Sequence, residues 1–262
     1  MNDLQVATHA ARAAGAIVAE GFGRHRTTDF KRRNDPVTDV DRAAEAAITA
    51  VLAEHRPDDS VQGEEGTAIS GGDRTWVIDP LDGTVNFVHG LPIVSVSVAL
   101  YAGDTPMVGV VHDPLRDETF SAVTGAGATV DDEPIHVSAT SDLEHALVVT
   151  GFPYDHHVHP AAYVRTIEGM LAEVNGIRRL GSAALDLCYV AAGRIDAYWE
   201  YNLNSWDIAA GLLILTEAGG VATTPSGSPM TLHDPHLVVA NPAIHERIRS
   251  IVDRTMPEHL RS

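Results

Sequence analysis

The stretch WVIDPLDGTVNF, residues 76 to 87, joins the most strand-like segment of the chain to two aspartates, a proline and a glycine-threonine turn. Its first three residues favour a buried β-strand. The strand runs directly into Asp79 and then Asp82, and two carboxylates three positions apart repel each other unless a positive charge lies between them. The stretch therefore predicts a strand end that holds something positive.

The composition limits the class of protein. The chain has 262 residues, 44% of them hydrophobic, which is enough to bury the core of one large domain or of two tightly joined halves. The 36 acidic and 18 basic residues give a formal net charge of −18, which repels nucleic acids and anionic lipid surfaces. Lys31 is the only lysine, and residues 31 to 33 are the only run of three basic residues. We therefore expect neither nucleic acid nor a membrane as a partner.

The single cysteine and the N-terminus bear on location. Cys188 excludes an internal disulfide and fits a reducing compartment. Its neighbours, LDLCYVAAG, resemble a packed helix, so we expect a buried thiol without a chemical role. Residues 1 to 22 lack the basic start and long apolar core of a signal peptide or a spanning helix. The cytoplasm is the expected location.

Apolar residues recur at helical spacing in two N-terminal segments. The first covers residues 3 to 21 and ends at a glycine pair. The second follows Thr38, which forms a capping-box pattern with Asp41, and continues to Pro57. Strands are then expected at 76 to 79, 93 to 101, 107 to 112 and 118 to 123. Turn residues at 125–127 and 131–132 indicate antiparallel hairpins.

After Asp142, strands alternate with helices, which indicates a layered α/β arrangement. Strands are expected at 146 to 150, 177 to 180, 194 to 200 and 236 to 240, and helices at 160 to 174, 183 to 192 and 206 to 218. Because no linker separates the halves, we expect a single catalytic unit over 1 to 262. Residues 1 to 142 would supply helices and an antiparallel sheet with the first metal motif, and residues 143 to 262 an α/β layer with the substrate pocket.

Acidic residues stand at the ends of several expected elements: Glu64, Glu65, Asp79, Asp82 and Asp207. Clusters of carboxylate oxygens suit hard cations such as Mg²⁺, whose coordination is completed by waters and phosphate oxygens. Pro80 stiffens the turn, and Gly83 allows the backbone to approach a ligand closely. A helix that begins near Thr84 would aim free N–H groups at the same point and attract an anion.

Each acidic residue also has a simpler interpretation. Asp82 before glycine is a common turn pair, and Glu64 with Glu65 suits a solvated loop. Asp41 and Asp207 suit the first turns of helices. The occurrence of all of them together favours a metal site.

The motifs in their order resemble one known family. Residues 76 to 89 as a whole resemble the first signature of the inositol monophosphatase family, and WDIAAGLLILTEAGG, residues 206 to 220, resembles the second. GEEG (63–66), residues 178 to 200 and DPVTDVD (35–41) resemble the family in the same order, and the likeness runs from about residue 5 to about residue 250. The resemblance implies an α+β fold, a layered α-β-α-β-α sandwich of the sugar phosphatase type that includes fructose-1,6-bisphosphatase.

The resemblance also implies two to three Mg²⁺ ions. Glu64, Asp79 and the carbonyl of Leu81 would hold one ion. Asp79 would bridge to a second ion that Asp82 and Asp207 complete, and a weaker third ion would lie near Glu64. Such sites favour in-line displacement at phosphorus by a metal-activated water.

Catalytic and substrate contacts are implied in the same way. Thr84 and Glu64 would position the attacking water, and Asp41 would hydrogen-bond Thr84. The phosphate and substrate contacts would be Asp82, Gly83, Thr84, Gly181, Ser182, Ala183, Glu200 and Asp207. Glu200 could accept two adjacent hydroxyls of a polyol, or could merely end a strand.

The substrate is expected to be myo-inositol monophosphate, because Asn86-Phe87 resembles the inositol phosphatase branch. Fructose 1,6-bisphosphate, NADP and histidinol phosphate are alternatives with the same fold and chemistry. A different class of function is that of a non-catalytic regulatory relative, for example a partner of the transcription machinery, although every expected acid is present. The resemblance also implies a homodimer and sensitivity to lithium, with a potency that depends on residues 24 to 37.

The stretch YDHHVHP, which begins at Tyr154, suggests zinc because His157 and His159 alternate. Zinc sites recruit further ligands at set spacings, which this stretch lacks. A solvated loop near the pocket is the favoured interpretation.

Overall fold

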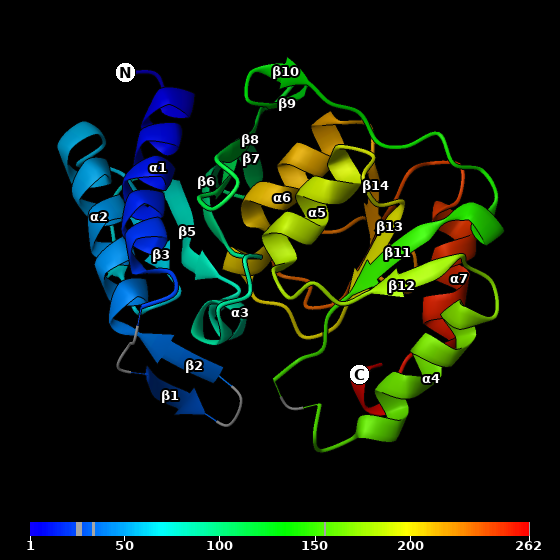
Figure 1. Cartoon of the computed structure of the whole chain (residues 1–262). Helices are drawn as coiled ribbons and strands as arrows, with labels where there is room; N and C mark the ends of the chain where they lie inside the picture. Colours follow the sequence, from blue (N-terminus) through cyan, green and yellow to red (C-terminus); the bar gives the residue numbers. More distant parts are fainter. Residues whose placement is uncertain (25–27, 33–34, 155, 262) are drawn as a thin grey trace.

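The computed structural model describes residues 1–24, 28–32, 35–154 and 156–261, which form five layers (Figure 1). An outer pair of helices packs on an eight-stranded sheet, an inner pair separates this sheet from a five-stranded one, and a third pair covers the far side. The pairs are α1 (Asp3–Gly21) with α2 (Asp39–His55), α5 (Ala183–Ala191) with α6 (Ser205–Glu217), and α4 (Pro160–Leu171) with α7 (His245–Thr255). The expected α-β-α-β-α sandwich is confirmed.

The first sheet has the strand order β10-β9-β8-β7-β6-β5-β3-β4 and is antiparallel except where β3 pairs with β5. Its strands are β3 (Ser60–Gly63), β4 (Ala68–Ile69), β5 (Arg74–Asp82), β6 (Ser95–Ala102), β7 (Thr105–Asp113), β8 (Glu118–Val123), β9 (Ala128–Val130) and β10 (Glu133–Pro134). The hairpins expected around 125–127 and 131–132 are confirmed, because they join β8 to β9 and β9 to β10.

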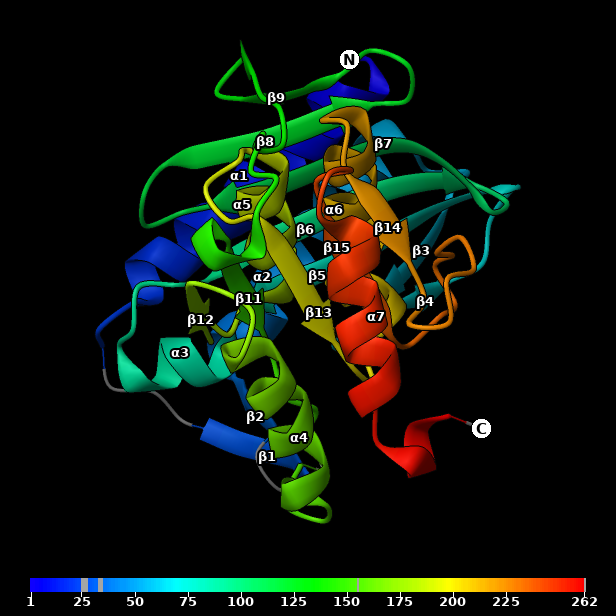
Figure 2. The same ribbon diagram turned by 90° about the vertical axis from the view of Figure 1, so that its right-hand side faces the viewer.

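The second sheet is mixed and has the order β12-β11-β13-β15-β14. Its strands are β11 (Leu147–Thr150), β12 (Gly176–Arg178), β13 (Ala197–Glu200), β14 (Val221–Thr223) and β15 (Leu237–Ala240). The first three run parallel, and β15 is antiparallel to both of its neighbours. Figure 2 shows this sheet from the side of α4 and α7, with the first sheet behind it.

Two further elements lie near the pocket described below. A separate hairpin of β1 (Thr28–Arg32) and β2 (Asp35–Thr38) precedes α2, and the short helix α3 (Thr84–His89) follows β5. The helix expected near Thr84 is therefore confirmed.

Burial explains the layering. The described residues form three apolar cores: one between the outer helices and the first sheet, one around α5 and α6 between the two sheets, and one between the second sheet and α4 with α7. Trp76 and Trp199 are among the largest fully buried side chains. Most residues of α5 and α6 are buried, as expected for helices enclosed between two sheets. Cys188 lies fully buried on α5, which confirms its expected burial.

Several expected elements have different ends. The strand expected at 76 to 79 extends over Arg74–Asp82. The helix expected to reach residue 174 ends at Leu171, because the N–H groups of residues 173 and 174 both donate to the Met170 carbonyl and close a turn. The strand expected from 194 begins at Ala197, because the N–H groups of 194 and 195 donate to the Tyr189 carbonyl at the end of α5. The sequence patterns did not predict β1 to β4, β14 or α7.

The boundary near residue 142 falls between the last strand of the first sheet and the first strand of the second. Since α6 packs on β6 and β7 of the first sheet, the second part of the chain supplies the inner helix layer for both sheets. The single catalytic unit stays a prediction. No helix among the described residues is long and apolar enough to cross a bilayer. Residues 25–27 and 33–34, within the segment linked to lithium potency, lie outside the described residues.

Candidate active site

A bulge at the end of β5 sets the two aspartates of the opening motif. Asp79 pairs with Ser97 and Asp82 with Ser95 of β6, so three steps along β5 match two along β6. In a regular strand, residues three apart point to opposite faces of the sheet. One extra residue removes this alternation and re-aims the side chain that follows it. Asp82 is thereby brought within electrostatic reach of the buried Asp79.

Asp82 is held by the N-terminus of α5. Its carboxylate accepts hydrogen bonds from Ser182 Oγ at 2.5 Å, the Ala184 N–H at 2.9 Å and the Ala183 N–H at 3.2 Å. Ser95 Oγ donates to the same carboxylate at 3.3 Å. A helix N-terminus carries partial positive charge, so α5 stabilises the ionised form of this group. These bonds oppose the effect of burial, which raises the pKa of Asp82.

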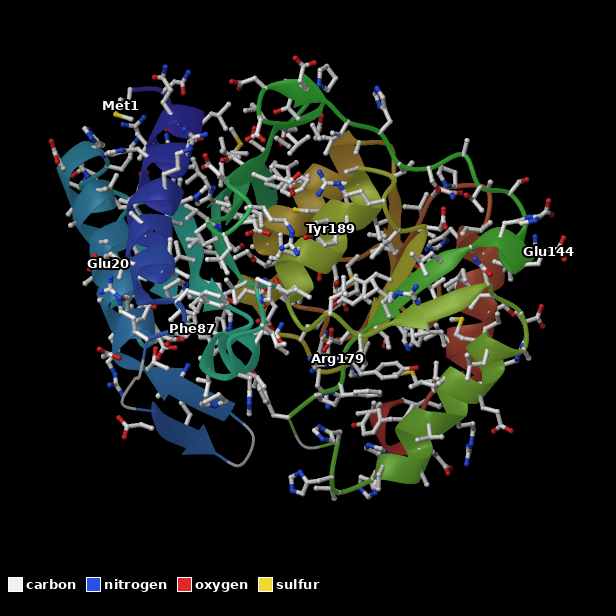
Figure 3. The ribbon with its side chains drawn as sticks, in the orientation of Figure 1. Met1, Glu20, Phe87, Glu144, Arg179 and Tyr189 are labelled. Carbon is white, nitrogen blue, oxygen red and sulfur yellow. The ribbon has the colours of Figure 1, made fainter. Side chains whose placement is uncertain are left out.

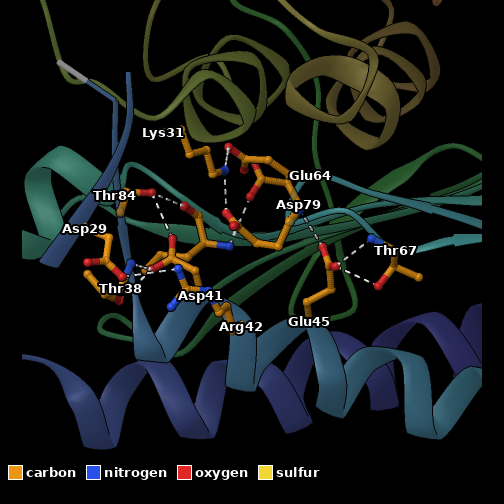
Figure 4. A network of polar contacts seen from close by, with 12 residues as sticks. Asp29, Lys31, Thr38, Asp41, Arg42, Glu45, Glu64, Thr67, Asp79 and Thr84 are labelled. Carbon is orange, nitrogen blue, oxygen red and sulfur yellow. Dashed lines mark hydrogen bonds and ion pairs between the residues drawn. The ribbon is translucent and has the colours of Figure 1, made fainter. Parts of the chain in front are cut away.

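Glu64 and Asp79 form a carboxyl pair beside the pocket (Figure 4). Each carboxyl influences the pKa of the other, so the two groups lie within electrostatic reach of each other. Burial raises the pKa of Glu64 to about 7. Burial, followed by the charges of Glu64, Asp82 and Asp207, raises the pKa of Asp79 well above its ordinary value. A cation bound between the two groups would therefore favour their ionised forms.

Lys31 places its ammonium on this acidic corner. Its Nζ lies 3.1 Å from Glu64 Oε1 and 2.6 Å from Glu65 Oε1. Although burial opposes the effect, Glu64 and Glu65 raise the pKa of Lys31 above its ordinary value. The only lysine of the chain is thus a charged counter-ion of Glu64.

Glu45 of α2 fixes the turn that carries Glu64. Its carboxylate accepts the Glu65 N–H at 2.8 Å, the Thr67 N–H at 3.0 Å and Thr67 Oγ at 2.6 Å (Figure 4). A Cβ on Gly63 would overlap this carboxylate, so only glycine leaves room for it. Glu45 therefore determines where residues 63 to 67 lie.

Asp41 links the start of α2 to the start of α3. Its Oδ2 accepts the Thr38 N–H at 2.8 Å and Thr38 Oγ at 2.5 Å, which confirms the expected capping box. Its Oδ1 lies 3.1 Å from Thr84 Oγ, as the family resemblance implied. Thr84 Oγ also lies 3.0 Å from the Leu81 carbonyl. The Thr84 hydroxyl thus has two acceptors for its one proton and keeps its lone pairs for a further partner.

All eight residues expected to contact phosphate or substrate line one pocket of about 620 Å³, counting the part open to solvent. Gly83 and Gly181 both have positive φ, 92° and 91°, and a Cβ on Gly83 would lie only 2.8 Å from the Ile93 carbonyl oxygen. Asn86 Nδ2 donates to the carbonyls of Ile93 and Leu180 at 2.9 and 2.8 Å and so joins the first motif to the 180–183 segment.

Glu200 and Asp207 complete the pocket. Glu200 Oε2 accepts the Tyr198 hydroxyl at 2.5 Å, and burial raises the pKa of Glu200 to about 7. Asp207 Oδ2 accepts the Asn204 N–H at 2.6 Å and Asn204 Nδ2 at 3.2 Å, at the start of α6. Burial and then Glu64 raise the pKa of Asp207 well above its ordinary value. Arg179, labelled in Figure 3, lines the same pocket.

The chemistry of these groups fits a hard divalent cation. Glu64, Asp79, Asp82 and Asp207 supply only oxygen donors, and burial raises the pKa of all four, so a bound cation would favour their ionised forms. Within the described ranges, no three His, Cys, Asp or Glu side chains already surround one point as metal ligands do. The Lys31 ammonium lies beside Glu64 and supplies one positive charge at this corner.

The histidine stretch begins at the pocket, because Tyr154 is part of the pocket wall. His157 and His159 are exposed, as expected for a surface loop, and the His159 ring packs on His259 with centroids 4.3 Å apart. Asp155 in this stretch lies outside the described residues.

A comparison with known families agrees with the fold and the motifs. The model of the inositol monophosphatase family matches residues 2–256. The chain belongs to the inositol monophosphatase family. This family member is 43% identical over 258 residues to the Nus factor SuhB of Pasteurella multocida, covering 97% of the chain and 96% of the relative. It is 40% identical over 262 residues to the inositol-1-monophosphatase of Synechocystis, covering 96% of the chain and 89% of the relative.

A solved structure gives the same result for the inositol monophosphatase fold. The extragenic suppressor protein suhB from Bartonella henselae superimposes with a TM-score of 0.92 at 37% identity, covering 95% of this chain and 98% of that one. The sequence of this family member did not predict the contacts of five pocket or neighbouring residues: Lys31, Glu45, Ser95, Tyr198 and Arg179. Except for Tyr198, these side chains contact or face residues that are distant in the sequence, so no local pattern predicts the contacts.

Proposed function

We propose that this protein is a Mg²⁺-dependent phosphomonoesterase that hydrolyses myo-inositol monophosphate to inositol and phosphate. The supporting observation is that residues of β5, α3, β13 and α6 line one pocket beside the Glu64–Asp79 carboxyl pair, namely Asp82, Thr84, Glu200 and Asp207. Membership of the family supports the same reaction.

The proposed metal ligands follow the family pattern. Glu64, Asp79 and the Leu81 carbonyl would hold one ion, and Asp79, Asp82 and Asp207 a second, with a weaker third near Glu64. Bound Mg²⁺ would supply Lewis acidity at the phosphate and lower the pKa of the attacking water. The oxygen-only donor set supports this assignment, and so do the raised pKa values of Asp79 and Asp207, because a cation would favour the ionised forms of both.

The chain's own residues would orient the water. The Thr84 hydroxyl donates its hydrogen bond to Asp41 or to the Leu81 carbonyl, so its lone pairs can accept a hydrogen bond from the water. Glu64 would accept the second hydrogen bond of the water. Asp41 is itself fixed by Thr38, and it therefore holds the Thr84 hydroxyl in one orientation.

The two ends of the pocket would hold the two parts of the ester. The N–H groups of Gly83 and Thr84, before the first hydrogen-bonded turn of α3, would donate to phosphate oxygens. Glu200 would accept inositol hydroxyls, with Gly181, Ser182 and Ala183 forming the adjacent wall. The Tyr198 bond to Glu200 Oε2 leaves Oε1 for this contact.

The decisive experiment is phosphate release from inositol 1-phosphate with Mg²⁺ and with EDTA, beside fructose 1,6-bisphosphate, NADP and histidinol phosphate. We expect Mg²⁺-dependent turnover with the highest kcat/KM on inositol 1-phosphate. A higher kcat/KM on another ester would reassign the substrate, and no release from any ester would reject the phosphatase.

The SuhB relative favours a second candidate, a regulatory partner of the transcription machinery. Binding of the purified protein to purified RNA polymerase would support it. Binding that persists in a hydrolysis-deficient variant would show that the two functions are separate.

We further propose that the protein is a cytoplasmic, lithium-sensitive homodimer. The support is the family membership and, for the dimer, Val85 and Val88 of α3, which are exposed beside Leu91. Light scattering that gives the mass of one chain would reject the dimer. Turnover unaffected by lithium chloride would reject the sensitivity.

A further inference from the structure

Asp186 is a buried carboxyl group without a hydrogen-bond partner. It lies in the first turn of α5 with 1% of its surface exposed, and no described residue hydrogen-bonds to either carboxyl oxygen. An isolated buried carboxylate is so costly that such a group becomes neutral instead. Burial, followed by the charges of Glu200 and Asp82, raises the pKa of Asp186 well above its ordinary value, and Arg179 opposes this only in part.

The neighbours of Asp186 connect it to the pocket. α5 packs against β13, which carries Tyr198 and Glu200. Burial, then Glu200, then Asp186 raise the pKa of the Tyr198 hydroxyl, so the three side chains form one buried electrostatic group. From the other elements, Asp82 of β5 and Arg179 ahead of α5 face this group. Asp186 itself is absent from the pocket wall, whereas Glu200 lines it.

Glu200 has an oxygen to spare. Tyr198 donates to Oε2, and no described residue donates to Oε1. The Glu200 carboxylate also packs so closely on Gly151 that a Cβ there would overlap it, which restricts its position from one side. A neutral carboxylic acid in an apolar setting acts as a hydrogen-bond donor.

We propose that Asp186 is a positioning residue for Glu200: as a neutral acid it donates a hydrogen bond, directly or through one water, to the Glu200 carboxylate. Asp186 and Tyr198 together then hold Glu200 as a fixed, ionised acceptor for hydroxyls of the alcohol part of the substrate. The inference rests on the proposed role of Glu200 in polyol binding. It assigns to Asp186 an effect on substrate selection rather than on the chemical step.

The test compares two esters and two variants. Asp186→Asn keeps a neutral donor of the same shape, whereas Asp186→Leu keeps the size and removes the donor. On inositol 1-phosphate, we expect Asp186→Leu to raise KM about tenfold, the effect of losing one hydrogen bond to a charged group, and Asp186→Asn to stay within about twofold of the wild type. On p-nitrophenyl phosphate, whose alcohol part has no aliphatic hydroxyls, KM should not change in either variant.

A double-mutant cycle separates positioning from a general structural effect. Added to Glu200→Gln, Asp186→Leu should have no further effect on KM, because its route to the substrate is already removed. A tenfold effect that persists in the Glu200→Gln background, or an equal effect on both esters, would overturn the proposal. So would an unchanged KM for inositol 1-phosphate in Asp186→Leu.

An infrared measurement keeps the proposal testable if Asp186→Leu does not fold or if the wild type hydrolyses neither ester. The wild-type minus Asp186→Asn difference spectrum of the Mg²⁺-loaded protein at neutral pH should contain the carbonyl band of a protonated carboxylic acid. A carboxylate band in its place would show that Asp186 is ionised and would overturn the inference. Failure of hydrolysis in the wild type, by contrast, would reject the proposed function while leaving this band to decide the state of Asp186.

Discussion

Glu45→Gln tests whether α2 positions the metal-binding turn. Glu45 is only 5% exposed and accepts three hydrogen bonds, one from Glu65 through Oε2 and two from Thr67 through Oε1. Glutamine keeps the oxygen that faces Thr67 and puts an NH₂ group opposite the Glu65 N–H. The variant therefore loses one charge-assisted bond and places two donors face to face.

The magnitude follows from these contacts. A hydrogen bond to a charged group contributes about 1.5–3 kcal/mol, and the remaining two bonds become neutral and weaker. We expect the free energy of unfolding of the metal-free protein to fall by about 2–3 kcal/mol. Because the same turn carries Glu64, the Mg²⁺ concentration for half-maximal activity should rise about tenfold, as is typical when a residue behind a metal ligand is removed.

The assay combines urea unfolding in EDTA with Mg²⁺ titration of phosphate release. Glu54→Gln is the matched control, because it makes the same chemical change at an exposed position of the same helix. The control should match the wild type in both measurements. If Glu45→Gln also unfolds within about 0.5 kcal/mol of the wild type and needs no additional Mg²⁺, then the three bonds do not position Glu64 and the reasoning is wrong.

Three other predictions concern the pocket. Asp79→Asn should abolish hydrolysis while the circular dichroism spectrum stays native, because the bridging carboxylate is lost; wild-type turnover would refute its role. Thr84→Val should lower kcat by about 10² or more, whereas Thr84→Ser should keep most of it, since only the hydroxyl orients the water; equal kcat values would contradict this. Burial raises the pKa of Glu200 from 4.5 to about 7, so its neutral form stabilises the metal-free fold at low pH. The free energy of unfolding of the wild type, relative to Glu200→Gln, should therefore fall as pH rises from about 4.5 through 7, by at most about 1.4 kcal/mol per unit, and a flat difference measured by urea titration would exclude the shift.

Local sequence patterns predicted much of the fold. The first two helices follow from apolar spacing and, for the second, from the Thr38–Asp41 box, whose two hydrogen bonds form as expected. The hairpins of the first sheet follow from alternation and from turn residues. These features depend on residues that are neighbours in the chain, so a single sequence contains the information.

The missed elements are short or largely polar. α7 has only three apolar side chains on its buried face, Ile248, Ile251 and Val252, within eleven residues rich in charge. Their burial becomes favourable only when β15 and α4 cover them. β1 to β4 are only two to five residues long, too short for a clear alternation of apolar and polar residues, and β3 also pairs with β5. Propensity cannot detect elements that tertiary contacts stabilise.

The same distinction applies to the site. The family motifs placed all eight phosphate and substrate candidates, and these residues share one pocket. The bulge between Asp79 and Asp82 was not predicted, because it depends on how β5 pairs with β6. The contacts of Glu45 and Lys31 connect residues about 20 to 34 positions apart, and no spacing rule reports them.

The carboxylates of the site differ in how the protein holds them. Asp82 Oδ2 accepts three hydrogen bonds, two of them from Ser182 and Ala184 at the start of α5. Asp207 Oδ2 accepts both of its bonds from Asn204. Asp79 Oδ1 accepts the Leu81 N–H at 3.0 Å. Asp79 and Asp207 are each anchored through one oxygen, so the other can meet a cation without loss of the anchor, whereas both oxygens of Asp82 accept an N–H from the start of α5. Glu64 has no such anchor, because its carboxylate accepts from the Lys31 ammonium and from no described backbone N–H. Three of the four acids would therefore hold a divalent cation from fixed positions, and the ion pair with Lys31 would compete for Glu64, which makes Glu64 the ligand whose position should depend most on metal binding.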